Sequence, residues 1–385
     1  MNNHLDAAIG GSAELSASTP VVAPVVAPVV APVVAGIDVS KRHLDACRQT
    51  VTGSSSRRFA NTPAGHRSLV DWLTSTLRRA EAPARPPAEA SPAEAPAEAS
   101  SVRVVVEATG RYGLDLALAL HRADRVQVMV ANPKAVRHHA KAQMSRTKTD
   151  GVDAAILADY AQRMPFTPWT PPSREVQQLR AIARRIQALT HDRAREKNRL
   201  EAHTAWADAC EVVTNDLDVN LRHLTRRIDE LVRQALKVIS RCTDLAAGAG
   251  HLMSVRGIAE KSAILLLGEL AVLPPGMSVR EWVAHAGLDP SAQESGTSVR
   301  APERISKIGN ARIRGALYMP AHVAIQREPS VGAFYQKLLD RGKPKMVAIV
   351  AVMRKLLHAI YGMLKHGEDF DGTKFYRPPT ADSAA

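Results

Sequence analysis

The segment VRVVVE, residues 102–107, constrains the fold more than any other part of this chain. Four of its six residues are valines, whose branched side chains favour extended backbone. Such a nearly apolar run, with Arg103 as its one interior charge, is typical of a strand buried on both faces, which requires a sheet with helices packed against each side. The run ends on Glu107, and a carboxylate at the margin of an apolar core requires a partner or a chemical purpose.

The segments around this strand complete a predicted α/β domain over residues 33–168. Three extended runs come first, and their tight connections predict an antiparallel meander: VVAGIDVS (33–40), HLDACRQT (43–50) and RRFAN (57–61). Helices and strands then alternate: a helix at 63–80, the strand at 102–107, the helix LDLALALHRA, the strand VQVMVA and a late helix. The order β-β-β-α-β-α-β-α describes a ribonuclease-H/RuvC-like fold, in which the first and fourth strands are neighbours.

Two low-complexity segments lie outside this pattern. Residues 1–32 form an Ala/Val/Pro leader with proline at every fourth position of its apolar run, a spacing that neither a signal peptide nor a membrane helix tolerates. Residues 80–101 are rich in alanine, proline and glutamate and predict a flexible insertion that does not pack.

The C-terminal half predicts a mainly α architecture. Residues 173–245 are charged, with apolar residues at three- and four-residue spacing; this predicts a coiled-coil hairpin, although a plain helix packed on its own domain fits equally well. Residues 246–367 predict a mainly α domain with a helix-hairpin-helix-like motif at Gly257, whose turn amides can hold a phosphate backbone. Its last, basic amphipathic helix is expected to pack structurally, and residues 368–385 are a tail.

Charge and cysteine usage narrow the functional class. The chain has 51 Lys and Arg against 38 Asp and Glu, a formal charge of +13, which favours a polyanionic partner such as nucleic acid. The three cysteines, Cys47, Cys210 and Cys242, are far apart and form no CxxC pair, which argues against a zinc ribbon and a secreted disulfide framework. We therefore expect a cytoplasmic protein with no membrane segment.

Four acidic residues stand out by position. Asp150 and Asp153 lie three apart on the late helix, about 60° apart around its axis, so both side chains can face one point. Such a pair is destabilising unless a cation compensates, and the candidates are Lys148 and a divalent metal ion. Asp38 lies at the end of the first strand, beside the expected position of Glu107.

Together these acids predict a site for two metal ions about 4 Å apart, with Mg²⁺ or Mn²⁺ as the cofactor that suits carboxylate oxygens. Each residue alone has a simpler interpretation: Asp150 or Thr149 as a helix N-cap, Asp153 as a solvated acid and Glu107 as a strand-end charge. The strand order favours the metal site. Two further acids, Asp45 and Asp159, are left out of it.

Two blocks of sequence carry a family resemblance. GIDVSK, VEATGRYG and ANPKAVRHHAKAQMSRTKTDGVDAAILADYA resemble the DEDD catalytic domain of the insertion-sequence 110 family of transposases. AGLDPSAQESGTSVRAPERISKIGNARIRGALY resembles that family's second, transposase-specific domain. The resemblance runs from about Val33 to about Gly367; the leader, the insertion and the turn sequence GIA in place of GIG depart from it.

The resemblance implies a chemistry. Asp38, Glu107, Asp150 and Asp153 take the places of the catalytic metal-binding acids, and Ser295 takes the place of the nucleophilic serine. The residues alone do not distinguish Ser295 from Ser291, Thr297 or Ser298. Attack by a serine on a phosphodiester gives a covalent phosphoserine. The resemblance further implies DNA partners, a structured guide RNA encoded by the element, and a homo-oligomer, dimer or tetramer, that combines acids and serine from different subunits.

Three functions follow as hypotheses. The first is a transposase or site-specific recombinase, with Lys307, Arg312 and Arg314 as phosphate contacts; a solvated basic helix face is the alternative for these three residues. The second is a RuvC-like Holliday-junction endonuclease that uses water, which predicts that Ser295→Ala keeps cleavage. The third is a non-catalytic nucleic-acid-binding protein, which predicts that Asp38→Asn leaves every activity intact.

Overall fold

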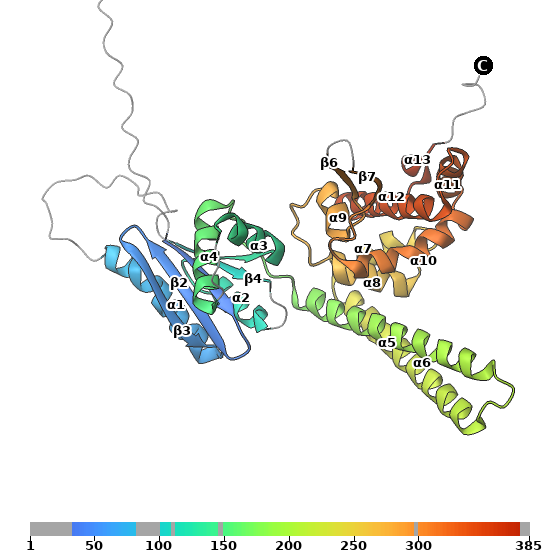
Figure 1. The fold of residues 1–385 in the computed structure, drawn as a ribbon, viewed down its shortest axis with the longest axis horizontal. Coiled ribbons are helices and arrows are strands. Elements are labelled where there is room, and N and C mark those ends of the chain that lie inside the picture. Colours follow the sequence, from blue (N-terminus) through green and yellow to red (C-terminus); the bar gives the residue numbers. More distant parts are fainter. Residues whose placement is uncertain (1–32, 82–100, 109–111, 145–148, 296–298, 378–385) are drawn as a thin grey trace, which may run out of the picture. The chain divides into compact units, whose positions relative to one another are not determined.

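The computed structural model describes residues 33–81, 101–108, 112–144, 149–295 and 299–377, which form two compact units divided after Trp169 (Figure 1). The leader, most of the insertion, Lys148, Thr297, Ser298 and the end of the tail lie outside these residues.

The first unit is built on a five-stranded mixed sheet. Its strands are β1 (Val33–Val39), β2 (His43–Thr50), β3 (Gly53–Ala60), β4 (Val102–Glu107) and β5 (Val126–Ala131). They lie in the order β3-β2-β1-β4-β5, with the first three antiparallel and with β4 parallel to both β1 and β5. The predicted meander is present, and the first and fourth strands are neighbours as expected.

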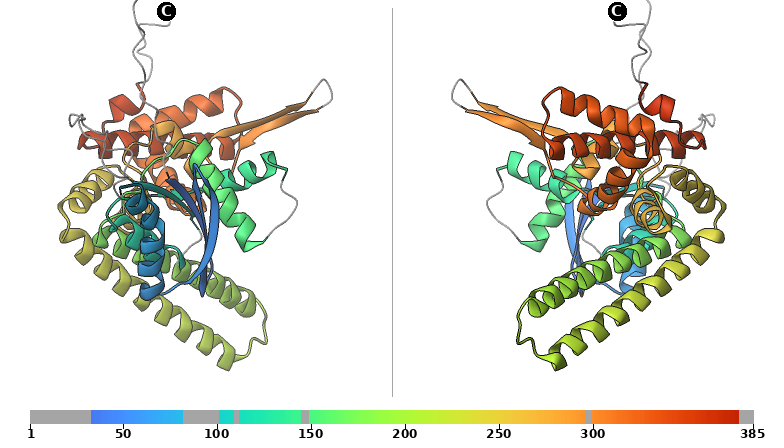
Figure 2. Two further views of the ribbon diagram at one scale, coloured as in Figure 1. Left: turned by 90° about the vertical axis from the view of Figure 1, so that its left-hand side faces the viewer. Right: turned by 90° about the vertical axis from the view of Figure 1, so that its right-hand side faces the viewer.

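Helices cover both faces of the sheet. Helices α1 (Pro63–Glu81) and α2 (Leu114–His121) share a core with one face, and α3 (Pro133–Ala142) and α4 (Asp150–Arg163) pack against the other (Figure 2). Strand β4 contributes to both cores: Val104 and Val106 belong to the first, and Val105 to the second. This double burial is what the valine-rich sequence of β4 predicted.

The second unit begins with two long helices, α5 (Arg174–Thr204) and α6 (Glu211–Ser240), which lie side by side (Figure 1). Leu179 and Ile186 of α5 belong to the same buried core as Leu224 and Ile228 of α6. Farther along the pair, the Asn220 side chain donates to buried Glu196 at 2.7 Å. The helices therefore bury their apolar faces within one chain.

Seven helices and a β-hairpin form the rest of the second unit in the described residues. They are α7 (Thr243–Met253), α8 (Glu260–Leu270), α9 (Val279–Ala286), β6 (Pro290–Ser295), β7 (Val299–Ile305), α10 (Ala311–Arg327), α11 (Pro329–Asp340), α12 (Lys345–His366) and α13 (Gly372–Phe375). The predicted linker 173–245 and domain 246–367 lie within this one unit.

Helix α12 is long and apolar enough to cross a membrane by length and composition. Its apolar side, however, supplies Val352, Leu356, Leu357 and Ile360 to the core of the second unit, each almost fully buried. Packing within this unit therefore accounts for its composition, as expected for the last amphipathic helix.

Candidate functional site

The pairing of β1 with β4 places Asp38 beside Glu107. The parallel register pairs Ile37 with Val106, so Asp38 and Glu107 are the next residues on adjacent strands. Because side chains alternate between the two faces of a strand, Asp38 lies on the same face as Val34, which packs under α4. The two acids therefore share the face covered by α4.

Helix α4 lies directly on the backbone of β1. Gly36 makes this possible, because a β-carbon built at this position is 2.2 Å from the Ala158 nitrogen and 2.3 Å from the Ala154 oxygen. The N-terminal turn of α4 carries Asp150 and Asp153. Thr149 caps the helix by accepting from the Val152 backbone at 3.4 Å, which leaves the Asp150 carboxylate for other contacts.

Electrostatics link the acids of the sheet to those of the helix. The pKa of Asp38 is raised to about 6, first by burial, and then by the negative charges of Asp153, Asp150 and Asp45. A backbone hydrogen bond from Val39 opposes this shift. The negative charges that raise the pKa of Asp38 therefore come from α4 and β2, not from its own strand.

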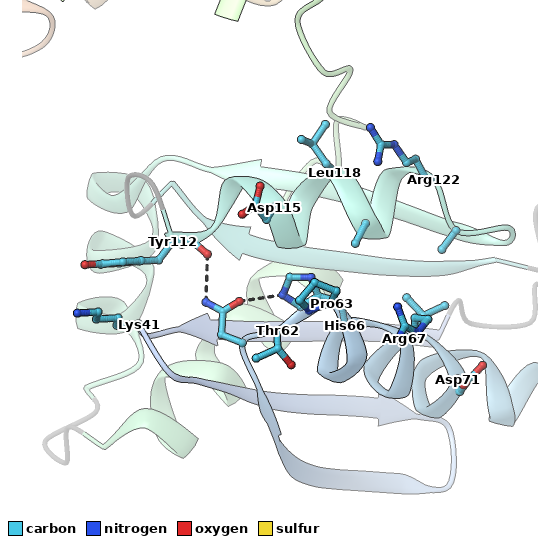
Figure 3. A pocket seen from close by; sticks show the side chains of 14 residues that line it. Lys41, Thr62, Pro63, His66, Arg67, Asp71, Tyr112, Asp115, Leu118 and Arg122 are labelled. Carbon is cyan, nitrogen blue, oxygen red and sulfur yellow. Dashed lines mark hydrogen bonds between the residues drawn. The ribbon is translucent and has the colours of Figure 1, made fainter. Parts of the chain in front are cut away.

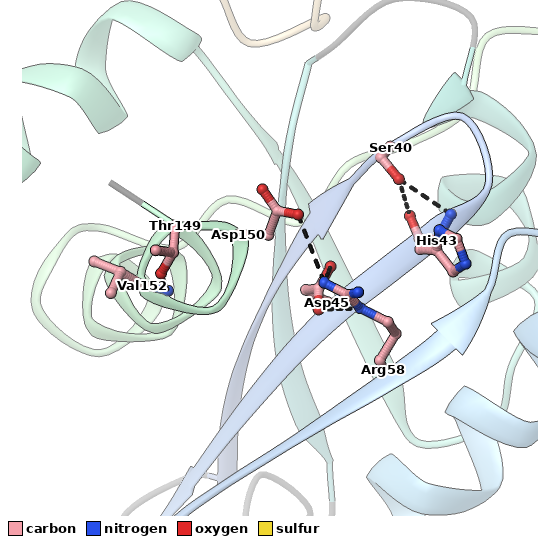
Figure 4. A network of polar contacts seen from close by, with 7 residues as sticks. All are labelled: Ser40, His43, Asp45, Arg58, Thr149, Asp150 and Val152. Atoms are coloured by element: carbon pink, nitrogen blue, oxygen red, sulfur yellow. Dashed lines mark hydrogen bonds and ion pairs between the residues drawn. The ribbon is translucent and has the colours of Figure 1, made fainter. Parts of the chain in front are cut away.

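Two residues that the sequence analysis did not select complete this arrangement. Asp45 pairs directly with Asp38 across β1 and β2, and Arg58 pairs with Asp45 across β2 and β3. The Arg58 guanidinium donates to both carboxylate oxygens of Asp45, at 2.8 and 3.1 Å, and its Nη2 lies 3.6 Å from Asp150 Oδ2 (Figure 4). The tight turn between β1 and β2 fixes this register. The short connection is visible in the sequence, and it was the feature that could have indicated that Asp45 lies beside Asp38.

Asp159, also left out, serves a different contact. Its carboxylate accepts from Arg163 at 2.7 Å and lies 2.8 Å from His139 Nε2, which joins α4 to α3. Burial would raise the pKa of Asp159, but the hydrogen bonds from Arg163 and His139 outweigh it and hold the pKa below its usual value. These partners give Asp159 a structural role.

The chemistry of this site fits a divalent cation. The donors of Asp38, Glu107, Asp150 and Asp153 are carboxylate oxygens, which Mg²⁺ and Mn²⁺ prefer. Burial is the largest cause of the raised pKa of Asp38, and the negative charges of Asp153, Asp150 and Asp45 add to it; a bound cation would neutralise these charges. As the side chains lie, no three Asp, Glu, His or Cys residues within the described ranges are already grouped around one point. The Arg58 guanidinium lies among the acids instead.

A polar contact on the opposite face links the loops that follow both sheet acids. The Asn61 side chain donates to the backbone oxygens of Ser40, at 2.9 Å, and Tyr112, at 3.2 Å. Its own oxygen lies 2.8 Å from His66 Nε2, and burial lowers the pKa of His66. Asn61, His66 and Tyr112 line a cavity of about 660 Å³ between α1 and α2; His66 and Tyr112 are labelled in Figure 3. Asn61 thus fixes the backbone beyond Asp38 and that beyond Glu107.

The candidate serine lies in the second unit. Ser295 is the last residue of β6, where it pairs with Val299 of β7. The hairpin extends outward from the helices of its unit (Figure 2). At its base the Ser306 hydroxyl donates to the Asp289 side-chain oxygen Oδ1 at 2.5 Å. The Ser306 backbone N–H donates to the Asp289 backbone oxygen at 2.9 Å.

A buried carboxylate anchors the segment that follows the hairpin. Glu269 of α8 is 2% exposed and accepts from Arg184 at 2.6 and 3.0 Å and from Asn310 at 2.8 Å. Burial favours the neutral acid, but the Arg184 and Asn310 hydrogen bonds outweigh it, so the pKa of Glu269 is lowered. Asn310 also caps α10 by accepting from the Arg312 backbone, which fixes the hairpin base to the helical core.

The predicted phosphate contacts differ in their surroundings. Lys307 and Arg312 are exposed, whereas Arg314 is half-buried and donates to the Ala286 oxygen at 2.7 Å, a contact within the fold. Gly257, in the turn between α7 and α8, has a φ of 122° and packs against α10, since an added β-carbon meets the Pro320 oxygen at 2.8 Å. Ala259, the residue of the GIA turn, has a φ of −93°, so it requires no left-handed backbone.

The chain is similar in sequence to known transposases and to gene-inverting proteins. Residues 35–205 match a sequence profile of a DEDD transposase domain named for IS110, and residues 249–336 match one described as the transposase IS116/IS110/IS902 family. The pilin gene-inverting protein of Moraxella lacunata is 29% identical over 346 residues, covering 87% of this chain and 97% of that protein. Its Moraxella bovis counterpart is 28% identical over the same length. A putative transposase of Sinorhizobium fredii is 26% identical over 336 residues, covering 70% of this chain and 82% of its own length.

Proposed function

Because the chain belongs to the IS110 family of transposases, enzymes that cleave and rearrange DNA, we propose that it exchanges DNA strands with a divalent metal ion and Ser295 as the nucleophile. The observation that carries the proposal is that Asp38 and Glu107 lie next to each other on the face of the sheet that α4 covers, while Asp150 and Asp153 lie in the first turn of that helix. Burial, and then the negative charges of Asp153, Asp150 and Asp45, raise the pKa of Asp38 to about 6. Such a concentration of carboxylates is costly without a cation.

Asp38, Glu107, Asp150 and Asp153 would hold Mg²⁺ or Mn²⁺. The ions would supply charge stabilisation at the scissile phosphate and ease deprotonation of the attacking hydroxyl. The protein's part is to fix the carboxylates: Gly36 sets the separation between α4 and β1, and the β1–β4 register sets Asp38 beside Glu107.

Ser295 would attack the scissile phosphorus through its Oγ. A new oxygen–phosphorus bond forms as the bond from phosphorus to the departing sugar oxygen breaks, and that oxygen gains the proton that serine loses. Attack by a sugar hydroxyl of another strand on the phosphoserine reverses these changes. The number of phosphodiester bonds is conserved, so the exchange needs no external energy source.

We further propose that the working enzyme is a cytoplasmic homo-oligomer in which the acids of one subunit act with Ser295 of another. The acids and the serine lie in separate compact units, which is compatible with such sharing. A structured guide RNA would choose the DNA sites by base pairing, while exposed cations such as Lys307 and Arg312 contact phosphates.

A denaturing gel for covalent protein–DNA adducts tests the proposal. Full-length protein is incubated with element-junction DNA, the flanking transcript and Mg²⁺. We expect an adduct with wild type and with Ser291→Ala, a matched control at the hairpin base, and none with Ser295→Ala or Asp150→Asn. A mixture of the two inactive variants regains adduct if subunits share the site. Cleavage that persists in Ser295→Ala without adduct identifies a water-using endonuclease instead.

A further inference from the structure

Four side chains form a continuous row across four strands of the first unit. The strand register places Glu107, Asp38, Asp45 and Arg58 in this order on β4, β1, β2 and β3, on the face that α4 covers. Three acids are therefore followed by one guanidinium on the edge strand. The N-terminal turn of α4 adds the Asp150 carboxylate to the arginine end of the row.

The two contacts of Arg58 are unequal. Its Nε and Nη2 bind both oxygens of Asp45, at 2.8 and 3.1 Å, and the Asp45 side chain is only 13% exposed. By contrast, Nη2 lies 3.6 Å from Asp150, whose side chain is 62% exposed. The bidentate pair is the strong one, and the contact with Asp150 is long and open to solvent.

We propose that Arg58 is a tethered counter-cation that competes with divalent metal for Asp150. Without metal its guanidinium balances part of the acidic charge; a bound metal ion takes Asp150 from it, while Asp45 keeps the guanidinium beside the site. Arg58 is thus a regulator of metal occupancy, and Asp45 is the residue that positions it. This inference rests on the proposed metal site at Asp38, Glu107, Asp150 and Asp153.

An arginine suits this role because its charge is permanent. A guanidinium does not lose its proton in proteins, so its repulsion of an incoming cation is relieved only when it moves away or is replaced. One positive charge at about 6 Å from a divalent ion lowers the affinity about tenfold in a water-like dielectric. Its bond to Asp45 limits how far Arg58 can withdraw.

Titration of the full-length protein with Mn²⁺ alone tests the inference, with free Mn²⁺ measured by electron paramagnetic resonance. Removing the competing charge in Arg58→Gln is expected to tighten Mn²⁺ binding about tenfold. Arg58→Lys keeps the charge and should remain close to wild type. Arg57→Gln is the matched control: it removes the same charge from the next residue of β3, where the guanidinium lies 5.3 Å from the ring centre of Phe59.

The outcomes separate this inference from the proposed function. If wild type binds Mn²⁺ in a way that Asp150→Asn weakens, but Arg58→Gln binds equally or less tightly, the metal site stands and Arg58 is not a competitor. If wild type shows no Mn²⁺ binding that depends on Asp150, both proposals fail. The Mn²⁺-induced rise in melting temperature, measured for each variant against its own metal-free state, should be largest for Arg58→Gln and corrects for any loss of fold stability.

Discussion

The contact between Gly36 and α4 offers a sharp test of how the acidic site is positioned. In Gly36→Ala the new β-carbon would lie 2.2 Å from the Ala158 nitrogen, 2.3 Å from the Ala154 oxygen and 2.5 Å from the Leu157 β-carbon. Two of these atoms are backbone, so no side-chain rotation relieves the overlap. Ordinary separations of about 3.5 Å require α4 to move outward by about 1 Å. Overpacking of this kind costs up to about 3 kcal/mol.

Hydrogen exchange of the α4 amides measures this cost locally. A loss of about 3 kcal/mol corresponds to roughly 100-fold faster exchange through opening of the helix. Gly151→Ala provides the control, because this first-turn position has no atom within 4 Å of an added β-carbon. There, alanine should slow exchange, since it stabilises a helix by about 1 kcal/mol relative to glycine. Unchanged hydrogen exchange of the α4 amides in Gly36→Ala would refute the close-contact argument. We also expect the affinity for Mn²⁺ to fall in Gly36→Ala but not in Gly151→Ala.

Two further predictions concern charge. Because the pKa of Asp38 is about 6 in the fold and 3.8 ordinarily, the native state binds the extra proton between these values, so stability falls as pH rises from about 4 to 6. Asp38→Asn should remove this loss, so at pH 7 its free energy of unfolding should exceed that of wild type by at most about 3 kcal/mol, measured by urea unfolding in EDTA. A wild-type free energy of unfolding that does not change between pH 4 and pH 6 would contradict this prediction. Glu269→Ala leaves Arg184 and Asn310 without their acceptor and should destabilise the second unit by about 3 kcal/mol, measured by exchange in α8 and α10. Glu269→Gln, which keeps one acceptor, should lose less.

Local patterns were sufficient to predict the sheet of the first unit. The valines of β4 report burial on both faces, and the short connections after β1 and β2 leave little choice but a meander. The proximity of Asp38 to Glu107 follows from that order alone. Asp45 was missed because its place depends on cross-strand register, and a shift of one residue would move it to the opposite face.

The second unit was less predictable. The β6 sequence PSAQES has no apolar alternation, so nothing local indicated a strand at Ser295, and the residue was selected by resemblance only. Apolar spacing in the long helices could not distinguish pairing within the chain from pairing between chains. The Glu269 contacts join α5, α8 and the start of α10, residues far apart in sequence, and no spacing rule predicts such a network.

The hairpin that carries Ser295 is attached to the helices of its unit at its base. Its base is clamped by Asp289, Ser306 and, through Asn310, by Glu269, whereas the strands beyond are held by their mutual ladder. From Pro290 to Ser295 the backbone spans about 17 Å, so a tilt of about 10° at the clamp moves the serine by about 3 Å. The stiffness of a few partly buried polar contacts at this base therefore sets how far the backbone at Ser295 can move.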